Sequence, residues 1–427
     1  MTDTMIKQED IYGKLPEEFF AFVREHANDS SADLLLKYSN VPLNFPLDLA
    51  VTQIEARKKN GMKNKFSAVH GFIFASSLLS EQSTADEIAT YHASIADDGN
   101  QPEILDITCG LAIDSFALAG VARNVTALDI NPDACNAANH NASVLGIRDF
   151  ICHNRDAESW LADPLTPRYD CIFADPARRK KSTQRAYAIA DCSPDIISLM
   201  NLIRKKTDRL IVKLSPMLDI RTIINELPMT NRITVVSLKG ECKEVLAEID
   251  FRKDAGEVSV TAVDLLEGWQ FDAGNFSFDR LGKSMSRFPL KYALADINPG
   301  DFLYMPGAAI MKTQAWSRLQ ERFPGLLKLN VNTHLFVAEH LQKFPGRVFL
   351  INDIYSSLKE AGKALSAIAK ATGRPFEANI ITRNHPLAPE ELKKRLGIKS
   401  SPTAETFIIA MRGYKNKNMI VRCKALA

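Results

Sequence analysis

The sequence predicts an α/β fold built on a parallel sheet, with a helical region before the sheet and α+β modules after it. The stretch Glu103–Asp129 predicts strand, tight turn, helix and strand, and both strands end in an aspartate. Further short β-branched runs follow at spacings that leave room for helices. Because ligands bind outside the carboxyl ends of parallel strands, Asp106, Gly110 and Asp129 are expected to share one crevice.

The segment before the sheet, residues 1–97, has a helical pattern. Pro16 starts one predicted helix, residues 29–33 cap a second, and Leu47–Asn60 forms a third. The sheet domain is then expected to span residues 98–268. Its later strands are predicted at residues 150–152, 169–174, 210–214 and 233–238.

An antiparallel end to this sheet is predicted by its last part. Residues 244–251 and 257–264 alternate between apolar and polar and are joined by the polar turn 252–256, the pattern of a hairpin.

After Gly268 the pattern changes to a loop-rich stretch followed by mixed helices and strands. Two small α+β modules are therefore expected at residues 269–345 and 346–427. Residues 271–298 are rich in loop signals. Helices are predicted at residues 308–322, 356–372 and 389–396, and strands at 335–338, 347–351, 377–383, 406–411 and 419–423.

The composition is that of an ordinary globular protein, with 46% apolar and 24% charged residues in a chain of 427. No apolar run approaches the ~18 residues that span a membrane, and the polar N-terminus is unlike a signal peptide. We therefore expect a cytoplasmic protein without membrane contact. Seven cysteines without a Cys-x-x-Cys pair predict reduced thiols and no metal site.

The turn after the first strand decides which nucleotide fits. A dinucleotide fold requires Gly-x-Gly-x-x-Gly, but the glycine positions here hold Gly110, Ala112 and Ser115. S-adenosylmethionine has no phosphate, but it carries an ammonium group and a ribose diol. Carboxylates at Asp106 and Asp129 suit these two groups, because ionised acceptors make strong hydrogen bonds.

These segments resemble class I S-adenosylmethionine-dependent methyltransferases. Residues 106–114, DITCGLAID, resemble their first motif, and residues 128–132, LDINP, resemble the second. Residues 139–146 are similar to the next helix of trimethylguanosine synthase-type RNA methyltransferases. Residues 155–157, RDA, match the acidic turn that reads the adenine amino group in this fold. Residues 175–178, DPAR, occupy the place of the catalytic motif.

The resemblance implies a Rossmann-like core with S-adenosylmethionine as cofactor. The residues expected to hold the cofactor are Asp106, Thr108, Gly110, Asp114, Asp129, Ile130, Asp156 and Ala157. The residues expected at the methyl acceptor are Asp175, Pro176, Arg178 and Lys213.

The tail resembles a family of THUMP-like methyltransferases, in which a ferredoxin-like module and a THUMP-like module follow the core. Residues 374–387 and 390–397 carry this resemblance. From Arg383 onward the chain has ten Lys or Arg against three Glu. Such a basic tail is either a solvated face or a surface for RNA, and the resemblance implies binding to tRNA or rRNA. The same alternative applies to the basic residues Arg57, Lys58, Lys59, Lys63 and Lys65.

The motif after the fourth strand leaves the acceptor open. Exocyclic-amine methyltransferases have Asp/Asn-Pro-Pro and an aromatic residue here, whereas this chain has Ala177 and Arg178. The guanidinium of Arg178 can stack on a base or hold a phosphate. Ribose 2′-hydroxyl methyltransferases place an aspartate and a lysine where Asp175 and Lys213 stand. A lysine whose pKa is lowered by burial can take the hydroxyl proton. The place of a cysteine nucleophile reads Ser215, which argues against 5-methyluridine chemistry.

The sequence therefore predicts an S-adenosylmethionine-dependent methyltransferase acting on RNA, at an exocyclic base amine or a ribose 2′-hydroxyl. Two alternatives remain. One is a degenerate RNA-binding protein that retains the cofactor, which the missing aromatic favours. The other is a methyltransferase acting on a protein or a small molecule, which the basic tail disfavours.

Overall fold

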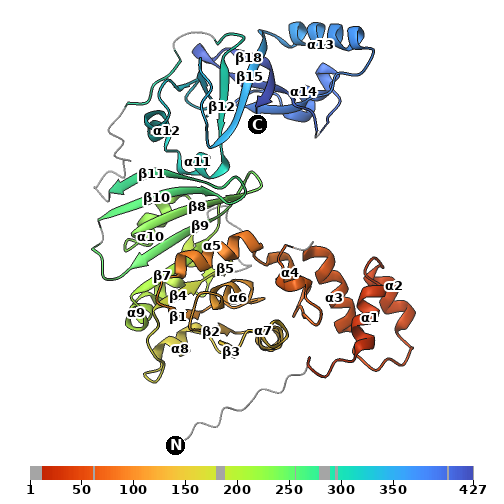
Figure 1. Ribbon diagram of the computed structural model, residues 1–427, viewed down its shortest axis with the longest axis vertical. Helices are drawn as coiled ribbons and strands as arrows, with labels where there is room; N and C mark the ends of the chain where they lie inside the picture. The colour runs from red at the N-terminus through yellow and green to blue at the C-terminus, as the bar shows by residue number, and fades with distance from the viewer. Residues whose placement is uncertain are drawn as a thin grey trace, which may run out of the picture. The chain divides into compact units, whose positions relative to one another are not determined.

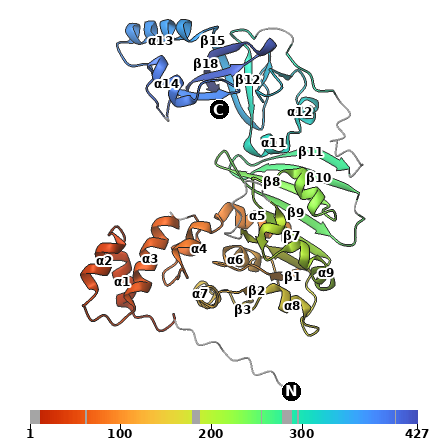
Figure 2. The ribbon, with the colours of Figure 1, turned by 180° about the vertical axis from the view of Figure 1, so that it is seen from behind.

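The computed structural model describes residues 12–60, 63–178, 188–254, 256–277, 289–293, 297–401 and 403–426, and these form two compact units. The first unit holds Met1–Ile233 and Glu244–Gly256, and the second holds Thr234–Lys243 and Glu257–Ala427. Figure 1 shows the elements coloured in chain order, and Figure 2 shows them from behind.

The N-terminal region is helical, as predicted. Its helices are α1 (Glu17–Glu25), α2 (Ser31–Tyr38), α3 (Leu47–Asn60), the 3₁₀ turn η1 (Phe66–Ala68), α4 (Ser77–Gln82) and α5 (Asp86–Ala96). The first three pack together around the buried side chains of Phe19, Leu34 and Ile54 (Figures 1 and 2). α1 follows Pro16, whose fixed φ suits a helix start.

Parallel strands form the centre of the first unit, in the order β7-β4-β1-β2-β3. The antiparallel strand β9 pairs with β7. These strands are β1 (Glu103–Asp106), β2 (Asn124–Asp129), β3 (Phe150–Asn154), β4 (Cys171–Ala174), β7 (Arg209–Leu214) and β9 (Glu241–Asp250). The helices between them are α6 (Ile113–Ala119), α7 (Pro132–Leu145), α8 (Ala157–Ala162), η2 (Ile189–Asp191), α9 (Ile196–Lys206) and α10 (Ile220–Glu226). A short ribbon joins β5 (Ala177–Arg178) to β6 (Cys192–Ser193).

The central strands are buried on both faces, which is why they read as continuous apolar runs. Ile104, Val125, Phe173 and Ile211 are all at most 1% exposed. Burial of one such side chain stabilises the fold by about 1.5–3 kcal/mol. The core therefore fixes the register of β1, β2 and β4, and with it the positions of the residues at their carboxyl ends.

The predicted antiparallel end of the sheet is confirmed, but the predicted hairpin is wrong. β9 pairs with β7, whereas β10 (Glu257–Asp264) pairs with β11 (Trp269–Ser277). Alternation in the sequence shows that two segments are strands, but it does not show which strands they pair with.

The second unit contains β8 (Arg232–Leu238), β10 and β11, followed by a seven-stranded sheet in the order β13-β14-β12-β15-β18-β17-β16. The strands of this sheet are β12 (Phe302–Pro306), β13 (Leu327–Lys328), β14 (Phe336–Ala338), β15 (Gly346–Tyr355), β16 (Asn379–Arg383), β17 (Thr406–Arg412) and β18 (Asn418–Leu426). Its helices are α11 (Ala308–Thr313), α12 (Trp316–Arg322), α13 (Leu358–Thr372), α14 (Pro389–Leu396) and the 3₁₀ turn η3 (Tyr414–Asn416).

One sheet therefore runs through both of the modules expected in the tail, because β12 pairs with β15 and β15 pairs with β18. Two further expectations are corrected. Residues 271–277 belong to strand β11 rather than to a loop. The single helix expected at 308–322 is two helices, and it breaks where Gln314 takes the left-handed conformation with φ of 53°.

Two of the sequence expectations concern the cysteines and the helices. The seven cysteines are free, and Cys109 and Cys171 are buried as small apolar side chains. No helix among the described residues is both long and apolar enough to cross a membrane.

Candidate functional site

Three predicted motifs lie at one edge of the first unit's sheet. β1, β2 and β4 are parallel neighbours, so their carboxyl ends meet there. Asp106 closes β1, Asp129 closes β2, and Asp175 follows β4 directly. Two backbone bonds connect these ends, because Cys109 N donates to Leu128 O over 2.8 Å and Ile107 N donates to Phe173 O over 3.1 Å.

The turn after β1 is organised around the carboxylate of Asp106, which is only 1% exposed. It accepts hydrogen bonds from Thr108 N at 2.8 Å, Thr108 Oγ1 at 3.2 Å and Ser115 Oγ at 2.5 Å. Burial raises the pKa of Asp106 to about 7, although these hydrogen bonds act in the opposite direction. The buried carboxylate of Asp106 thus stabilises the turn by accepting these hydrogen bonds. Its contact with a cofactor ammonium stays a prediction.

Asp129 and Gly110 form the next part of the site. Gly110 N donates to Asp129 Oδ2 over 2.8 Å, and Asn131 N donates to Oδ1 over 2.8 Å. Gly110 has a φ of 53°, a left-handed conformation that favours glycine, and a Cβ at this position would be in van der Waals contact with Leu79 Cδ2 at 3.9 Å and Thr108 O at 4.0 Å. Ile130 is 73% exposed, a large apolar side chain next to an acceptor carboxylate.

The turn after β3 supplies the remaining predicted cofactor contacts. Asp156 is the exposed N-cap of α8 and accepts from Ser159 N at 2.8 Å and Ser159 Oγ at 2.6 Å. These hydrogen bonds lower the pKa of Asp156, so its carboxylate is ionised at neutral pH. Ala157 beside it is buried.

These residues fit S-adenosylmethionine. Exposed Ile130 offers an apolar face to an adenine ring, and Asp129 offers acceptors to a ribose diol. Asp114, which is also predicted to hold the cofactor, has a side chain that is only 12% exposed, and its contact with the cofactor stays a prediction. Its oxygens accept from Thr84 Oγ1 at 2.6 Å and from His92 Nδ1 at 2.8 Å.

Asp175 and Lys213 form an ion pair. Lys213 Nζ lies 2.7 Å from Asp175 Oδ2, and 38% of the Asp175 side chain is exposed. Asp175 N donates to Thr108 Oγ1 over 2.6 Å, which ties the acceptor motif to the cofactor turn. The structure therefore brings together two of the four residues that the sequence predicts at the methyl acceptor.

The expected direction of the Lys213 pKa was wrong. Burial by itself lowers the pKa of the ammonium, but the carboxylates of Asp175, Asp114 and Glu244 outweigh burial and raise the pKa above its usual value. Lys213 is therefore protonated at neutral pH and cannot accept a proton. It acts as a fixed cation.

The other two predicted acceptor residues, Pro176 and Arg178, follow Asp175. Pro176 is buried beside Asp175. The backbone of Arg178 pairs with Cys192 in the β5–β6 ribbon, but the side chain of Arg178 and residues 179–187 lie outside the described part of the chain.

The sequence analysis did not identify His92, whose ring lies between the carboxylates of Asp114 and Glu244. His92 Nε2 lies 2.5 Å from Glu244 Oε1, and the ring is fully buried. Lys213 Nζ also donates to Thr84 Oγ1 over 3.1 Å. The available signal was a lone histidine on the apolar face of α5, which is ordinarily a core residue.

A pH dependence of stability follows from His92. Burial alone disfavours the imidazolium, but Glu244 and Asp114 outweigh it and raise the pKa of His92 to about 10 from 6.5. A raised pKa contributes stability that is fully present below pH 6.5 and is lost as the pH rises through 10. We expect the free energy of unfolding to fall across this window, and to fall less in His92→Gln. Urea denaturation at several pH values tests this, and parallel curves for both proteins would contradict it.

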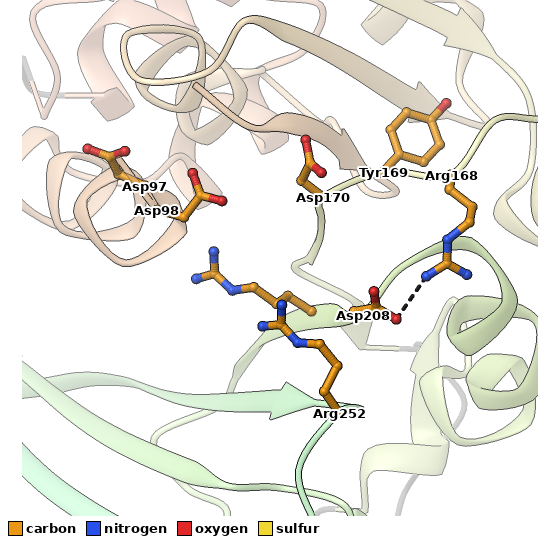
Figure 3. A pocket seen from close by; sticks show the side chains of 8 residues that line it. Asp97, Asp98, Arg168, Tyr169, Asp170, Asp208 and Arg252 are labelled. Carbon is orange, nitrogen blue, oxygen red and sulfur yellow. Dashed lines mark hydrogen bonds and ion pairs between the residues drawn. The ribbon is translucent and has the colours of Figure 1, made fainter. Parts of the chain in front are cut away.

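The opposite edge of the sheet carries a polar pocket of about 400 Å³, shown in Figure 3. Arg168 pairs there with Asp208 at 2.8 Å, and Arg209 donates to the carbonyls of Ile95 and Ala96 at the end of α5. The contacts of Arg209 place a cation at the carboxyl end of α5. None of the residues that line this pocket is a predicted cofactor or acceptor residue.

The basic residues of the tail are partly neutralised. Five of the ten take part in ion pairs: Lys393 with Glu390, Arg395 with Glu391, Lys399 with Glu377, Arg422 with Asp353 and Lys424 with Glu405. The N-terminal basic residues are also engaged, since Arg57 donates to two backbone carbonyls and Lys59 pairs with Glu81. Within the described residues, no group of three His, Cys, Asp or Glu could hold a metal ion.

Comparison with known proteins supports the predicted relationship in two parts of the chain. Residues 302–345 match the model of a ferredoxin-like domain, and residues 346–425 match that of a THUMP domain-like family. A crystal structure of a candidate methyltransferase from Porphyromonas gingivalis W83 matches with a TM-score of 0.79 and 26% identity, over 96% of this chain and 99% of that one.

Curated relatives match over a shorter stretch. An uncharacterized S-adenosylmethionine-dependent methyltransferase from Mycobacterium tuberculosis is 29% identical over 33% of this chain and 36% of its own length. An uncharacterized RNA methyltransferase from Streptococcus pyogenes serotype M3 is 26% identical over 33% of this chain and 32% of its own length. The chain thus spans about a third of these relatives. The chain is related to S-adenosylmethionine-dependent methyltransferases, and its C-terminal part contains a ferredoxin-like and a THUMP-like domain.

Proposed function

We propose that this protein is a cytoplasmic methyltransferase that uses S-adenosylmethionine to methylate an RNA. The observation that carries the proposal is the Asp175–Lys213 ion pair, which lies at the carboxyl end of β4 and is bonded through Thr108 to the cofactor turn. S-adenosylmethionine supplies the methyl group as a sulfonium. The protein's part in such a displacement is to orient the acceptor atom.

The proposed acceptor is an exocyclic base amine. Lys213 is protonated and so cannot take the proton of a ribose hydroxyl. Asp175 is half-exposed and can accept an N–H of an amine, which fixes the nitrogen and stabilises its developing positive charge. Pro176 follows Asp175 as in the related motif, and the guanidinium of Arg178 is proposed to stack on the base in place of the missing aromatic ring.

RNA as substrate is proposed from the C-terminal part. A THUMP-like domain, the excess of ten Lys or Arg over three Glu from Arg383 onward and a relative described as an RNA methyltransferase support it. The proposed organisation is a helical region at 1–97, a methyltransferase domain at 98–268, a ferredoxin-like module at 269–345 and a THUMP-like module at 346–427.

A second candidate is an RNA-binding protein that retains the cofactor without transferring its methyl group, which the missing aromatic after Pro176 favours. The test is tritium transfer from labelled cofactor into total RNA from a strain lacking the gene, followed by nucleoside mass spectrometry. N-methylated bases would support the proposal. Cofactor and RNA binding without transfer would support the second candidate, and methylated ribose would overturn the amine assignment.

Asp129→Ala is expected to weaken S-adenosylmethionine binding by about 100-fold, because a charge-assisted hydrogen bond contributes about 1.5–3 kcal/mol and Gly110 N also loses its acceptor. Calorimetric titration measures the effect. The matched control is Asp133→Ala, an exposed aspartate four residues later, which should bind as wild type does. Equal weakening in both variants would indicate a general charge effect instead of a cofactor contact.

A further inference from the structure

We propose that His92 is a positioning residue for the acceptor site. Its charged ring compensates the carboxylate of Asp114, so that the ammonium of Lys213 pairs with Asp175 instead. The inference rests on the proposed function, because it assigns to His92 a part in orienting the acceptor carboxylate. His92 touches neither the cofactor turn nor Asp175 and would act only through Asp114 and Lys213.

The geometry makes the ring of His92 a cation. Its Nδ1 lies 2.8 Å from Asp114 Oδ1, and its Nε2 lies 2.5 Å from Glu244 Oε1. A neutral imidazole has one N–H donor, but two carboxylates face the ring and each requires a donor. Both nitrogens therefore carry protons. The packing on Phe173, at 5.3 Å between ring centroids, holds the ring in this position.

The charges alternate along the network. Asp175, Lys213, Asp114, His92 and Glu244 follow one another as anion, cation, anion, cation and anion. The side chains of Glu244 and Asp114 are 3% and 12% exposed, whereas that of Asp175 is 38% exposed. Asp175 is therefore the accessible end of the network, at the face where an acceptor would bind.

The ammonium of Lys213 lies near two carboxylates, those of Asp175 and Asp114. Its Nζ lies 2.7 Å from Asp175 Oδ2 but 3.9 Å from Asp114 Oδ2. Asp114 already receives His92 Nδ1 and Thr84 Oγ1, so its need for a cation is met. Without the charge on His92, the buried carboxylate of Asp114 would keep only the Thr84 hydroxyl and the more distant Lys213 as partners, and it would attract Lys213 more strongly. Asp175 would then lose the bond that fixes its orientation.

The test compares wild type with His92→Gln and with the double variant His92→Gln/Glu244→Gln, which removes one charge of each sign. The proposal expects kcat to fall about tenfold in both variants, with the KM for S-adenosylmethionine unchanged, because a misplaced reacting group lowers the rate of transfer but not cofactor affinity. Thermal unfolding should show that the double variant regains the stability that the single variant loses. Recovery of kcat in the double variant would overturn the proposal, since His92 would then only compensate Glu244.

Crystal structures of the three proteins give a readout that needs no substrate. In both variants Lys213 Nζ should lie closer to Asp114 and farther from Asp175 than in wild type. An unmoved Nζ, or a kcat unchanged in His92→Gln, would overturn the inference. Wild-type protein that transfers no methyl group, while Nζ moves in the variants, would overturn the proposed function and leave the positioning of Asp175 supported.

Discussion

Asp175→Ala is expected to lower the rate of methyl transfer by about 10³-fold, because a preorganised charged acceptor at the reacting atom contributes about 3–4 kcal/mol to the transition state. The carboxylate follows β4 and its oxygen faces Lys213, while the cofactor residues lie at the ends of β1, β2 and β3. Binding of S-adenosylmethionine should therefore stay close to that of wild type. Loss of transfer without loss of binding is the signature of an interaction made mainly in the transition state.

The measurement pairs single-turnover transfer with calorimetric titration of the cofactor. The control is Asp170→Ala, an exposed aspartate immediately before the same strand, at the opposite edge of the sheet. This variant should keep the wild-type rate. A loss of cofactor binding in Asp175→Ala equal to the loss of rate would place Asp175 in the cofactor site and refute its role at the acceptor.

The core and most of the candidate site could be predicted from the sequence, because both depend on local pattern. A buried parallel strand is an apolar run, and a carboxylate at its end lies at the ligand-binding edge. Asp106 and Asp129 were predicted in this way, and Asp175 was predicted from the resemblance of its motif. The structure places all three at the ends of neighbouring strands.

The charge state of the site could not be predicted, because it depends on contacts between distant parts of the chain. His92 and Glu244 are 152 residues apart, and only the pairing of β9 with β7 brings Glu244 into the first unit's core. Burial of a lone lysine would lower its pKa, and the expectation for Lys213 rested on that. In the structure, the carboxylates of Asp114 in α6, Glu244 in β9 and Asp175 after β4 raise the pKa of Lys213 instead.

The pairing of the last strands of the first sheet was also not predicted correctly from the sequence. Residues 257–264 and 269–277 form the antiparallel pair, although the polar turn at 252–256 had suggested a different partner. Asp272, Gly274 and Asn275 resemble loop residues, yet β11 accommodates Gly274 with a φ of 95° next to a shift in register. Irregular strands of this kind have weak sequence signals.

Lys213→Met is expected to lower the free energy of unfolding by about 3 kcal/mol, because removing one partner of a buried ion pair leaves its carboxylates without compensation. Lys213 is 15% exposed and contacts both Asp175 and Asp114. Lys213→Arg keeps the charge and is the matched control, with a smaller loss expected from its larger head group. Urea denaturation of both variants at neutral pH measures the difference.

The same two variants distinguish the acceptor atoms. A ribose oxygen loses a proton during transfer and depends on a neighbouring cation or base, so its methylation should fall about 10³-fold in Lys213→Met. An amine loses its proton readily after methylation, so its transfer should fall only about tenfold, through the poorer orientation of Asp175. Rates measured with saturating S-adenosylmethionine at a temperature where both variants are folded decide between them. A loss near 10³-fold in Lys213→Met with full activity in Lys213→Arg would assign Lys213 to oxygen chemistry and refute the proposed amine acceptor.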